Sequence, residues 1–508
     1  MLFSCSDTEQ ENLLAGKELS EVGDKAVLTL TLRMPEVGTA SRAVAQPETE
    51  NSRAEECKIS DALVILGKMA DGLNAPTMID QKFYVNNFEY DGNQSQWTTS
   101  ILCNPGYYRI LVIANPGKLI RLEDITSSSW HTLANRILSF EDFNRLKTIW
   151  DDNYFLMTNA YQGTTEDFDV HLILGEHANK VIAVQRACAR FDYQVKQADN
   201  IYPLPCVVDG RPATLNIQLQ EVALMNVSKS FNLFKQIVAD NRLGTIPDFY
   251  QTEKADNYVY DSDWDAKRIF ALNLIEANHL NEYFFYPSEQ GRNNIPTEQG
   301  QDIVPLVHLS YQPLPHEVTH TDVRLMYCSE NTIPGIKAQV NKLSTGLVFK
   351  GYFGKPKEVD KIPDEFYSRI VGGKTLIYTS LESLKKALQD EGIPLPKTMT
   401  ENHLANLHIS KFTPDKKTGK CSVWYTYWNR HRDNHDNQLM GIMEFAVVRN
   451  NLYKLSINSI KSLGLPQPPN MPENPWKPAG ETPDEVIPQL DITVKVCDWL
   501  NRELNHHI

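Results

Sequence analysis

Apolar and polar residues alternate strictly in two short segments, one near each end of the chain. Residues 25–34 and residues 490–497 both repeat with a period of two, which is typical of a β-strand with one face against a core. The apolar faces consist of Leu28, Leu30, Leu32 and Met34 in the first segment and Leu490, Ile492, Val494 and Val496 in the second. We predict a strand in each segment. Because the two faces are alike, one strand can be removed and the other supplied by a second molecule.

Similar patterns predict strands along most of the remaining chain. They cover residues 58–66, 107–114, 168–174, 179–185, 213–223, 322–328, 344–352, 421–428, 441–449 and 451–460. Helical spacing is confined to part of residues 122–152 and to a helix capped by Thr379, with Glu382 completing a capping box. Many strands with few helices predict a mostly β protein with two β-sandwich domains in tandem and a few short helical insertions.

Changes in composition predict five parts of the chain. These are residues 1–24, which read as a truncated lipoprotein signal and a polar tether; 25–56, the first strand with an exposed loop; 57–236, an N-terminal β-sandwich; 237–464, a C-terminal β-sandwich; and 465–508, a spacer with the last strand. The boundary near residue 236 marks the start of an acidic, weakly patterned stretch. The spacer contains eight prolines between residues 465 and 489, a composition typical of an extended, semi-rigid segment.

The overall composition is that of a globular protein. The chain has 508 residues, of which 41% are hydrophobic and 22% are charged, and its formal net charge is −14. The length predicts two to four domains. An acidic chain without a local basic patch repels the phosphates of nucleic acids, so we predict no nucleic-acid partner. The sequence also lacks a run of about 18 uninterrupted apolar residues, which argues against a membrane-spanning helix.

The eight cysteines are scattered along the chain and do not have zinc-finger spacing. Most have apolar or β-branched neighbours, as Cys188 does between two alanines. We predict that they are small buried hydrophobic residues rather than metal ligands or a disulfide scaffold.

Residues His316–His320 match the zinc-binding motif H-E-x-x-H literally. The motif needs both histidines on one face of a helix. Here two prolines precede it and a strand-like run follows it, and residues four apart in a strand are separated by ~13 Å. We therefore interpret the match as chance.

Three further motif fragments are incomplete. Asp261–Asp265 resembles an EF-hand loop but lacks its glycine and its final glutamate, which favours a solvated acidic turn. Gly372–Thr375 resembles the end of a P-loop, but Ser368 replaces the first glycine. His431–Asn437 is a polar run that favours a hairpin loop over a metal cluster. We predict that the protein is not an enzyme and has no cofactor and no metal.

Several longer segments are similar to a known family. Residues 327–332 (Tyr-Cys-Ser-Glu-Asn-Thr), Gln339 and residues 344–349 resemble the C-x-E-N-T … T-x-V stretch of the fimbrillins of Bacteroidales. Residues 424–431 and 443–455 resemble the C-terminal domain of the minor-fimbrium, Mfa-type major subunit. Looser similarities to the first sandwich of the family occur at residues 110–115, 155–158 and 184–190.

This resemblance implies a precursor exported as a lipoprotein with two transthyretin-like β-sandwiches. Cys5, preceded by Leu2 and Ser4 as at the end of a bacterial lipoprotein signal, is then the lipidated (palmitate-carrying) residue. Arg42, followed by Ala43, is the residue after which an Arg-specific protease cuts, and Arg53 is the second choice. The first strand is thereby displaced, and subunits assemble into a type V pilus.

The predicted function is that of a structural shaft subunit of a cell-surface fimbria, which polymerises by donor-strand exchange and supports adhesion, biofilm formation and virulence. Its expected partners are copies of itself, anchor and tip fimbrial proteins, host or bacterial surface receptors, and the cell outer membrane through the lipid anchor before processing. One alternative is a tip or accessory fimbrial adhesin. Another is a cell-surface glycan-binding lipoprotein that uses an aromatic platform in residues 424–428.

Overall fold

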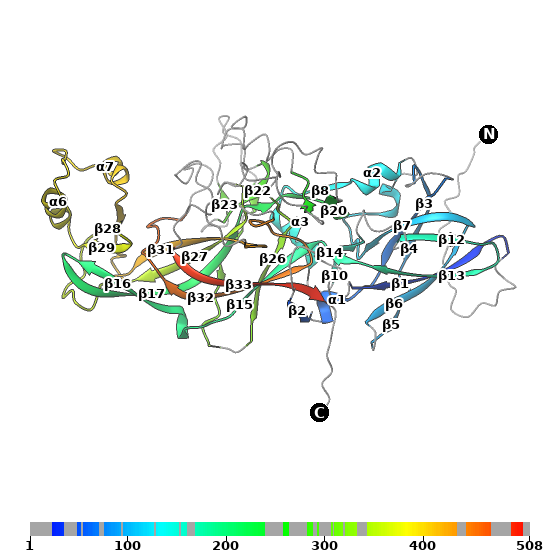
Figure 1. The fold of residues 1–508 in the computed structure, drawn as a ribbon, viewed down its shortest axis with the longest axis horizontal. Coiled ribbons are helices and arrows are strands. Elements are labelled where there is room, and N and C mark those ends of the chain that lie inside the picture. The colour runs from blue at the N-terminus through cyan, green and yellow to red at the C-terminus, as the bar shows by residue number, and fades with distance from the viewer. Residues whose placement is uncertain are drawn as a thin grey trace, which may run out of the picture.

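The computed structural model describes most of the chain. The described residues are 23–34, 48–51, 54–70, 76–92, 95–125, 129–151, 154–159, 168–238, 258–263, 282–287, 292–293, 306–307, 309–318, 321–332, 343–433, 443–468 and 489–500. They form an elongated body in which an N-terminal and a C-terminal β-sandwich lie end to end (Figure 1).

The N-terminal sandwich is built from two sheets. The first has the strand order β13 (His177–Ala183), β1 (Ala26–Arg33), β6 (Gln96–Cys103) and β5 (Glu89–Asp91). The second has the order β14 (Gln185–Arg186), β11 (Met157–Thr158), β7 (Gly106–Ala114), β3 (Ala62–Lys68) and β4 (Ile79–Val85), with β12 (Asp169–Leu172) also on β7. β3 and β7 are almost wholly apolar because both of their faces are covered.

The C-terminal sandwich also has two sheets. One has the order β2 (Glu48–Asn51), β33 (Leu490–Leu500), β32 (Asn451–Ile460), β15 (Cys188–Tyr193) and β26 (Val323–Ser329). The other has the order β30 (Ser410–Phe412), β28 (Phe366–Val371), β29 (Lys374–Tyr378), β16 (Ile201–Val208), β17 (Arg211–Met225), β27 (Gly346–Phe353) and β31 (Cys421–Trp428), with β25 (Gln312–Pro313) on β17. Tyr202 joins the sheets, because its hydroxyl lies 3.3 Å from that of Tyr193 and donates to the carbonyl of Ile457.

Small elements complete the fold. Short strand pairs are β8 (Ile137–Ser139) with β19 (Ser230–Asn232), β9 (Trp150–Asp151) with β10 (Tyr154–Phe155), β18 (Val227–Ser228) with β22 (Phe284–Phe285), β20 (Gln236–Val238) with β21 (Tyr258–Tyr260), and β23 (Arg292–Asn293) with β24 (Leu306–Val307). The helices are α1 (Ala54–Cys57), α2 (Trp130–Ala134), α3 (Phe143–Lys147), α6 (Leu381–Asp390) and α7 (Glu401–Asn406), with 3-10 turns at Leu122–Asp124 and Ala198–Asn200. The prediction of a mostly β chain with two sandwiches and few helices is confirmed.

The cap predicted for helix α6 is wrong by one residue. Ser380, not Thr379, accepts a hydrogen bond from the backbone of Ser383, and Ser383 rather than Glu382 completes the capping box. Thr379 instead donates its hydroxyl to Asp209 at 2.5 Å. The serine pair satisfies the first backbone amides of the helix. The threonine instead ties the start of the helix to the turn between β16 and β17.

The predicted strand at residues 441–449 is also wrong where the structure describes it. Residues 443–450 form turns, with a single bridge from Val447 to Asn331. Met443 and Asn450 both have positive φ, near 59°, a conformation that interrupts an extended strand.

The change from the N-terminal to the C-terminal sheets falls between β14 and β15. Strands β15, β16 and β17 lie within residues 188–225, yet all their sheet partners belong to the C-terminal sandwich. By strand pairing, the C-terminal sandwich therefore begins at Cys188, earlier than the predicted boundary near residue 236.

All seven cysteines that the structure describes are buried and free of disulfides, as predicted. Among the described residues, none of the helices has the length and apolar character needed to cross a membrane. Within that same part of the chain, no group of three or more His, Cys, Asp or Glu side chains is placed to hold a metal ion.

Candidate assembly site

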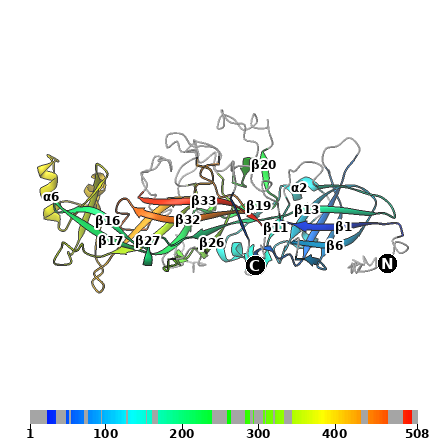
Figure 2. The same ribbon diagram turned by 60° about the horizontal axis from the view of Figure 1, so that its bottom comes forward.

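Strand β1 lies in the middle of its sheet. It pairs in parallel with β13 over Val27–Arg33 and antiparallel with β6 over Ala26–Arg33 (Figure 2). Its two neighbours therefore take up the hydrogen-bonding groups on both of its edges. Removing β1 would leave a slot between β13 and β6 with unpaired backbone groups along both sides.

The two faces of β1 differ as the sequence pattern predicts. Leu28, Leu30 and Leu32 are 0% exposed, and Met34 is 4% exposed. On the other face, hydroxyl pairs join the strand to β6, with Thr31 lying 3.0 Å from Thr98. The slot that removal of β1 would leave is thus lined by apolar residues and accepts four side chains at alternate positions.

The residues predicted for lipidation and proteolysis, Cys5, Arg42 and Ala43, lie outside the described residues. So does Arg53. Strand β2 lies between Arg42 and Arg53 in the sequence and pairs in parallel with the end of β33, Glu48 opposite Cys497 and Asn51 opposite Leu500. Helix α1 follows directly after Arg53.

Strand β33, the predicted donor, lies on its own C-terminal sandwich. It pairs antiparallel with β32 over Leu490–Asp498, and within the described part of the chain β2 pairs with its other edge only at Cys497–Leu500. Leu490 is buried, whereas Ile492, Val494 and Val496 are half-buried and pack against the core. The predicted apolar face is therefore in use within the same molecule, at the rim of the sheet.

The C-terminal end of β33 is anchored by one large side chain, that of Trp499, which is 0% exposed. The guanidinium of Arg186 lies 4.2 Å from the centre of the Trp499 ring, and the ring of Tyr327 stacks on it at 5.9 Å. Phe155 meets it edge-on, also at 5.9 Å. The indole Nε1 donates to Glu56 Oε2 at 3.2 Å. We call Glu56, Arg186, Tyr327 and Trp499 the Trp499 clamp.

Polar contacts inside the Trp499 clamp are extensive. The Glu56 carboxylate also accepts from Arg190 at 2.8 Å and from the Tyr327 hydroxyl at 2.6 Å. Arg186 donates to the Trp499 carbonyl at 3.0 Å and to the Glu56 carbonyl at 2.7 Å. The pKa of Tyr327 is raised mainly by burial and secondly by the nearby Glu56 carboxylate. The phenol therefore stays protonated and remains a hydrogen-bond donor. Helix α1, both sandwiches and the last strand thus meet at one buried cluster.

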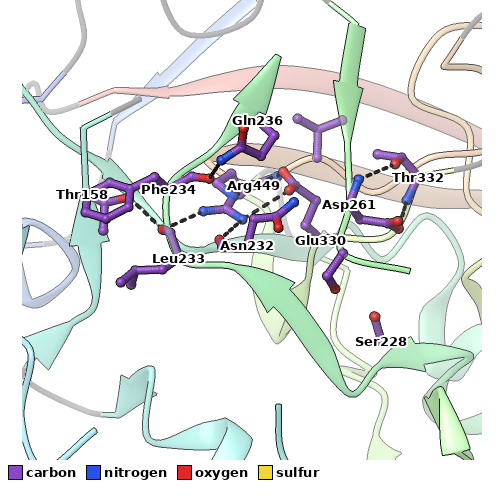
Figure 3. Close-up of polar contacts among 12 residues, drawn as sticks. Thr158, Ser228, Asn232, Leu233, Phe234, Gln236, Asp261, Glu330, Thr332 and Arg449 are labelled. Atoms are coloured by element: carbon purple, nitrogen blue, oxygen red, sulfur yellow. Dashed lines mark hydrogen bonds and ion pairs between the residues drawn. The ribbon is translucent and has the colours of Figure 1, made fainter. Parts of the chain in front are cut away.

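A second buried ion pair connects the two segments that carry the family resemblance. Arg449 donates to Glu330 at 3.1 Å from both Nε and Nη2, and both residues are at most 1% exposed (Figure 3). Arg449 also donates to the carbonyls of Asn232 and Leu233, at 2.6 and 3.2 Å. These backbone oxygens satisfy the rest of the guanidinium, which is the condition under which a buried charge is tolerated. The motif residues therefore have a structural role.

The acidic turn at Asp261 is buried rather than solvated, contrary to the prediction. Asp261 accepts from the backbone of Thr332 at 2.8 Å (Figure 3), and Asp263 accepts from Ser228 and Ser230 at 2.8 and 2.7 Å. The carboxylates thus bind hydroxyl and amide donors of the protein.

The other motif fragments do not form catalytic sites in the described residues. His316, Glu317 and Val318 are exposed and non-helical, and His320 lies outside the described part. Gly372 and Gly373 make the tight turn between β28 and β29, both with positive φ.

His431 lies after the end of β31, outside any strand, and its side chain is buried. Its Nδ1 lies 2.9 Å from the Tyr453 hydroxyl. The same hydroxyl accepts from the Val448 amide at 2.9 Å. Burial lowers the pKa of His431 to about 3.

The aromatic run in β31 does not form an exposed platform. Trp424, Tyr425 and Trp428 are 5%, 0% and 6% exposed. Because sugar-binding aromatic residues must present a ring face to solvent, this burial removes the main support for a glycan-binding site there.

Sequence reasoning missed the Trp499 clamp. Trp499 lies two residues after Cys497, so in a strand both side chains point to the face opposite Val494 and Val496. This spacing was the available signal that Trp499 is buried beside Cys497. Its partners Glu56, Arg186 and Tyr327 are far apart in the sequence and have no shared motif.

Comparison with known proteins points to fimbriae. Residues 418–505 match the family described as "Major fimbrial subunit protein type IV, Fimbrillin, C-terminal", which confirms the predicted resemblance in the part that holds β31, β32 and β33. No curated protein matches the chain.

Two of the solved structures that match this chain are from Porphyromonas gingivalis. A fimbrilin (FimA) has 13% identity and a TM-score of 0.40, with 94% of this chain and 99% of that chain covered. The tip fimbrial protein Mfa3, with a C-terminal truncation, has 10% identity and a TM-score of 0.36, with 94% and 100% covered.

Proposed function

We propose that this protein is a structural subunit of a cell-surface fimbria that polymerises by donor-strand exchange. In this proposal, proteolysis within the loop after β1 frees that strand, and β33 of a neighbouring subunit takes its place. The match of residues 418–505 to the fimbrillin family supports the fimbrial role.

The observation that carries the proposal is the central position of β1. It is a short strand at the start of the chain, with partners on both sides and an apolar face that is entirely buried. Strand β33 offers the same alternation of four apolar side chains. Burying four such side chains at ~1.5–3 kcal/mol each contributes on the order of 6–12 kcal/mol before the cost of ordering the strand.

The proposal includes export as a lipoprotein anchored at Cys5 and cleavage after Arg42, with Arg53 as the second choice. Anchor and tip proteins and surface receptors are the expected further partners. A tip or accessory adhesin remains the second candidate; it would keep the slot under β1 but lack a usable donor, and the long, regular β33 disfavours it.

A cross-link that ties β33 to its own subunit tests the proposal. Leu452 and Cys497 are directly opposite in the antiparallel pair of β32 and β33. Residues so paired have Cα atoms about 4.5–5.5 Å apart, within the range that a disulfide spans. In Leu452→Cys, oxidation should therefore join position 452 to Cys497. We expect that oxidised, processed subunits form no fibres and that reductant restores them, as followed by electron microscopy.

Leu452→Ser is the matched control, since it changes the same buried site without adding a thiol. Its fibres should be insensitive to oxidant. Normal fibres from protein whose cross-link is verified by mass spectrometry would show that β33 is not the donor.

A further inference from the structure

We propose that the Trp499 clamp is a lock that keeps β33 on its own subunit until assembly. The inference rests on the proposed function, because it assigns to the clamp the control of donor release. It concerns four residues from four elements: Glu56 of α1, Arg186 of β14, Tyr327 of β26 and Trp499 of β33.

The burial of β33 is uneven along its length. The middle of the strand is half-buried at Ile492, Val494 and Val496, and no strand pairs with its outer edge there among the described residues. At the C-terminal end, Cys497 is 1% exposed and Trp499 is 0% exposed. Peeling the strand away must therefore break its strongest contacts at this end.

The pocket around Trp499 satisfies each polar atom of that residue. Its Nε1 donates to Glu56, its carbonyl accepts from Arg186, and its backbone amide donates to the Asn450 carbonyl at 3.3 Å. The Arg186 guanidinium over the ring adds a cation–π contact in a site closed to water. Withdrawing the indole would leave the Glu56 and Arg190 ion pair short of a donor and open a large cavity.

The clamp also joins β33 to the segment that processing alters. Glu56 is the third residue after Arg53, and β2 lies between Arg42 and Arg53 while pairing with Cys497–Leu500. A cut after Arg42 keeps β2 attached to α1 and leaves the lock complete. A cut after Arg53 detaches β2 and exposes the outer edge of the strand beside Trp499. The position of the cut thus sets how firmly the donor is held.

Hydrogen exchange in the full, uncut chain tests the lock independently of assembly. In Trp499→Ala, we expect amides of residues 490–500 to exchange at least tenfold faster than in the natural protein, while amides of β1 are unchanged. The matched control is Leu490→Ala, which removes a buried side chain at the other end of the same strand and should change exchange less than threefold. Equal acceleration in both variants, or none in Trp499→Ala, would overturn the lock.

Glu56→Gln gives a second reading if Trp499→Ala does not fold. It keeps the size of the side chain but removes the charge that Arg190, Tyr327 and Trp499 contact, so exchange in residues 490–500 should rise several-fold. Unchanged exchange in a folded Glu56→Gln protein would contradict the lock in the same way.

Assembly of loop-cleaved protein separates the two proposals. If the lock holds, Trp499→Ala forms fibres at least tenfold faster than the natural protein, as followed by light scattering. Equal rates would overturn the lock while leaving donor-strand exchange standing. If neither protein forms fibres but hydrogen exchange is still faster in Trp499→Ala, the lock on β33 is supported. That result would contradict the proposed function alone.

Discussion

Strands β1 and β33 have the same sequence pattern but opposite situations in the fold. β1 has a partner strand on each side and buries its apolar face completely, whereas β33 has one partner along most of its length and leaves the same kind of face half-buried. An alternating pattern therefore specifies a strand and its inner face, but not how many neighbours the strand has. In the proposed exchange, β1 would have to be cut from the chain to leave, while β33 would need only to separate from β32 and the Trp499 clamp.

The sharpest way to test this difference is to place one charge on each strand. Leu30→Asp puts a carboxylate at a fully buried position with no partner, so we expect a loss of more than ~4 kcal/mol in the free energy of unfolding. Val494→Asp lies at the half-buried rim, where water still reaches it, and should cost about 1–2 kcal/mol. Urea denaturation followed by circular dichroism measures both. Equal losses would mean that the two strands are held alike.

Removing Arg449 tests whether the C-terminal sandwich can be weakened without affecting β1. Arg449→Leu leaves Glu330 as a buried, unpaired charge, and breaking such a pair costs about 3–5 kcal/mol. Because Arg449 lies two residues before the start of β32, hydrogen exchange should accelerate in β32 and β33 more than in β1.

Arg121→Leu is the control for the Arg449 variant, since it breaks an exposed ion pair with Asp124. It should change neither stability nor exchange measurably. A comparable loss in Arg121→Leu would indicate that the effect does not depend on burial.

Acid should weaken the support of β33 through His431. The folded protein holds this imidazole neutral, with a pKa of about 3, whereas an unfolded histidine has a pKa near 6.5. The unfolded chain therefore binds the extra proton between these values, and stability falls as the pH drops from about 6.5 toward 3. The slope is at most ~1.4 kcal/mol per pH unit for one proton.

His431→Gln keeps a side chain that can hydrogen-bond the Tyr453 hydroxyl but does not titrate, so its stability should depend less steeply on pH in this window. Tyr453 is the residue opposite Val496, which makes the effect local to β32 and β33. Parallel pH curves for the two proteins would exclude His431 as the cause.

The sequence predicts those features of the fold that depend on near neighbours in the chain. The burial of Leu28, Leu30 and Leu32 follows from a period of two, and the buried cysteines follow from their apolar neighbours. The burial of Asp261 could not be predicted, because it depends on Thr332 about seventy residues away. The Trp499 clamp was missed for the same reason: Glu56 and Trp499 meet only after both sandwiches have formed.

A buried native cysteine is associated with each of the two strands. Cys103 of β6 is directly opposite Ala26 of β1 and is 0% exposed, and burial raises its pKa to about 12. Cys497 lies on β33 itself and is 1% exposed. A thiol reacts as the thiolate and only where a reagent can reach it, so both should resist alkylation in the intact subunit. Loss of β1 would uncover Cys103 and release of β33 would uncover Cys497. One alkylation time course, read by mass spectrometry, would then date the two events separately without any introduced label.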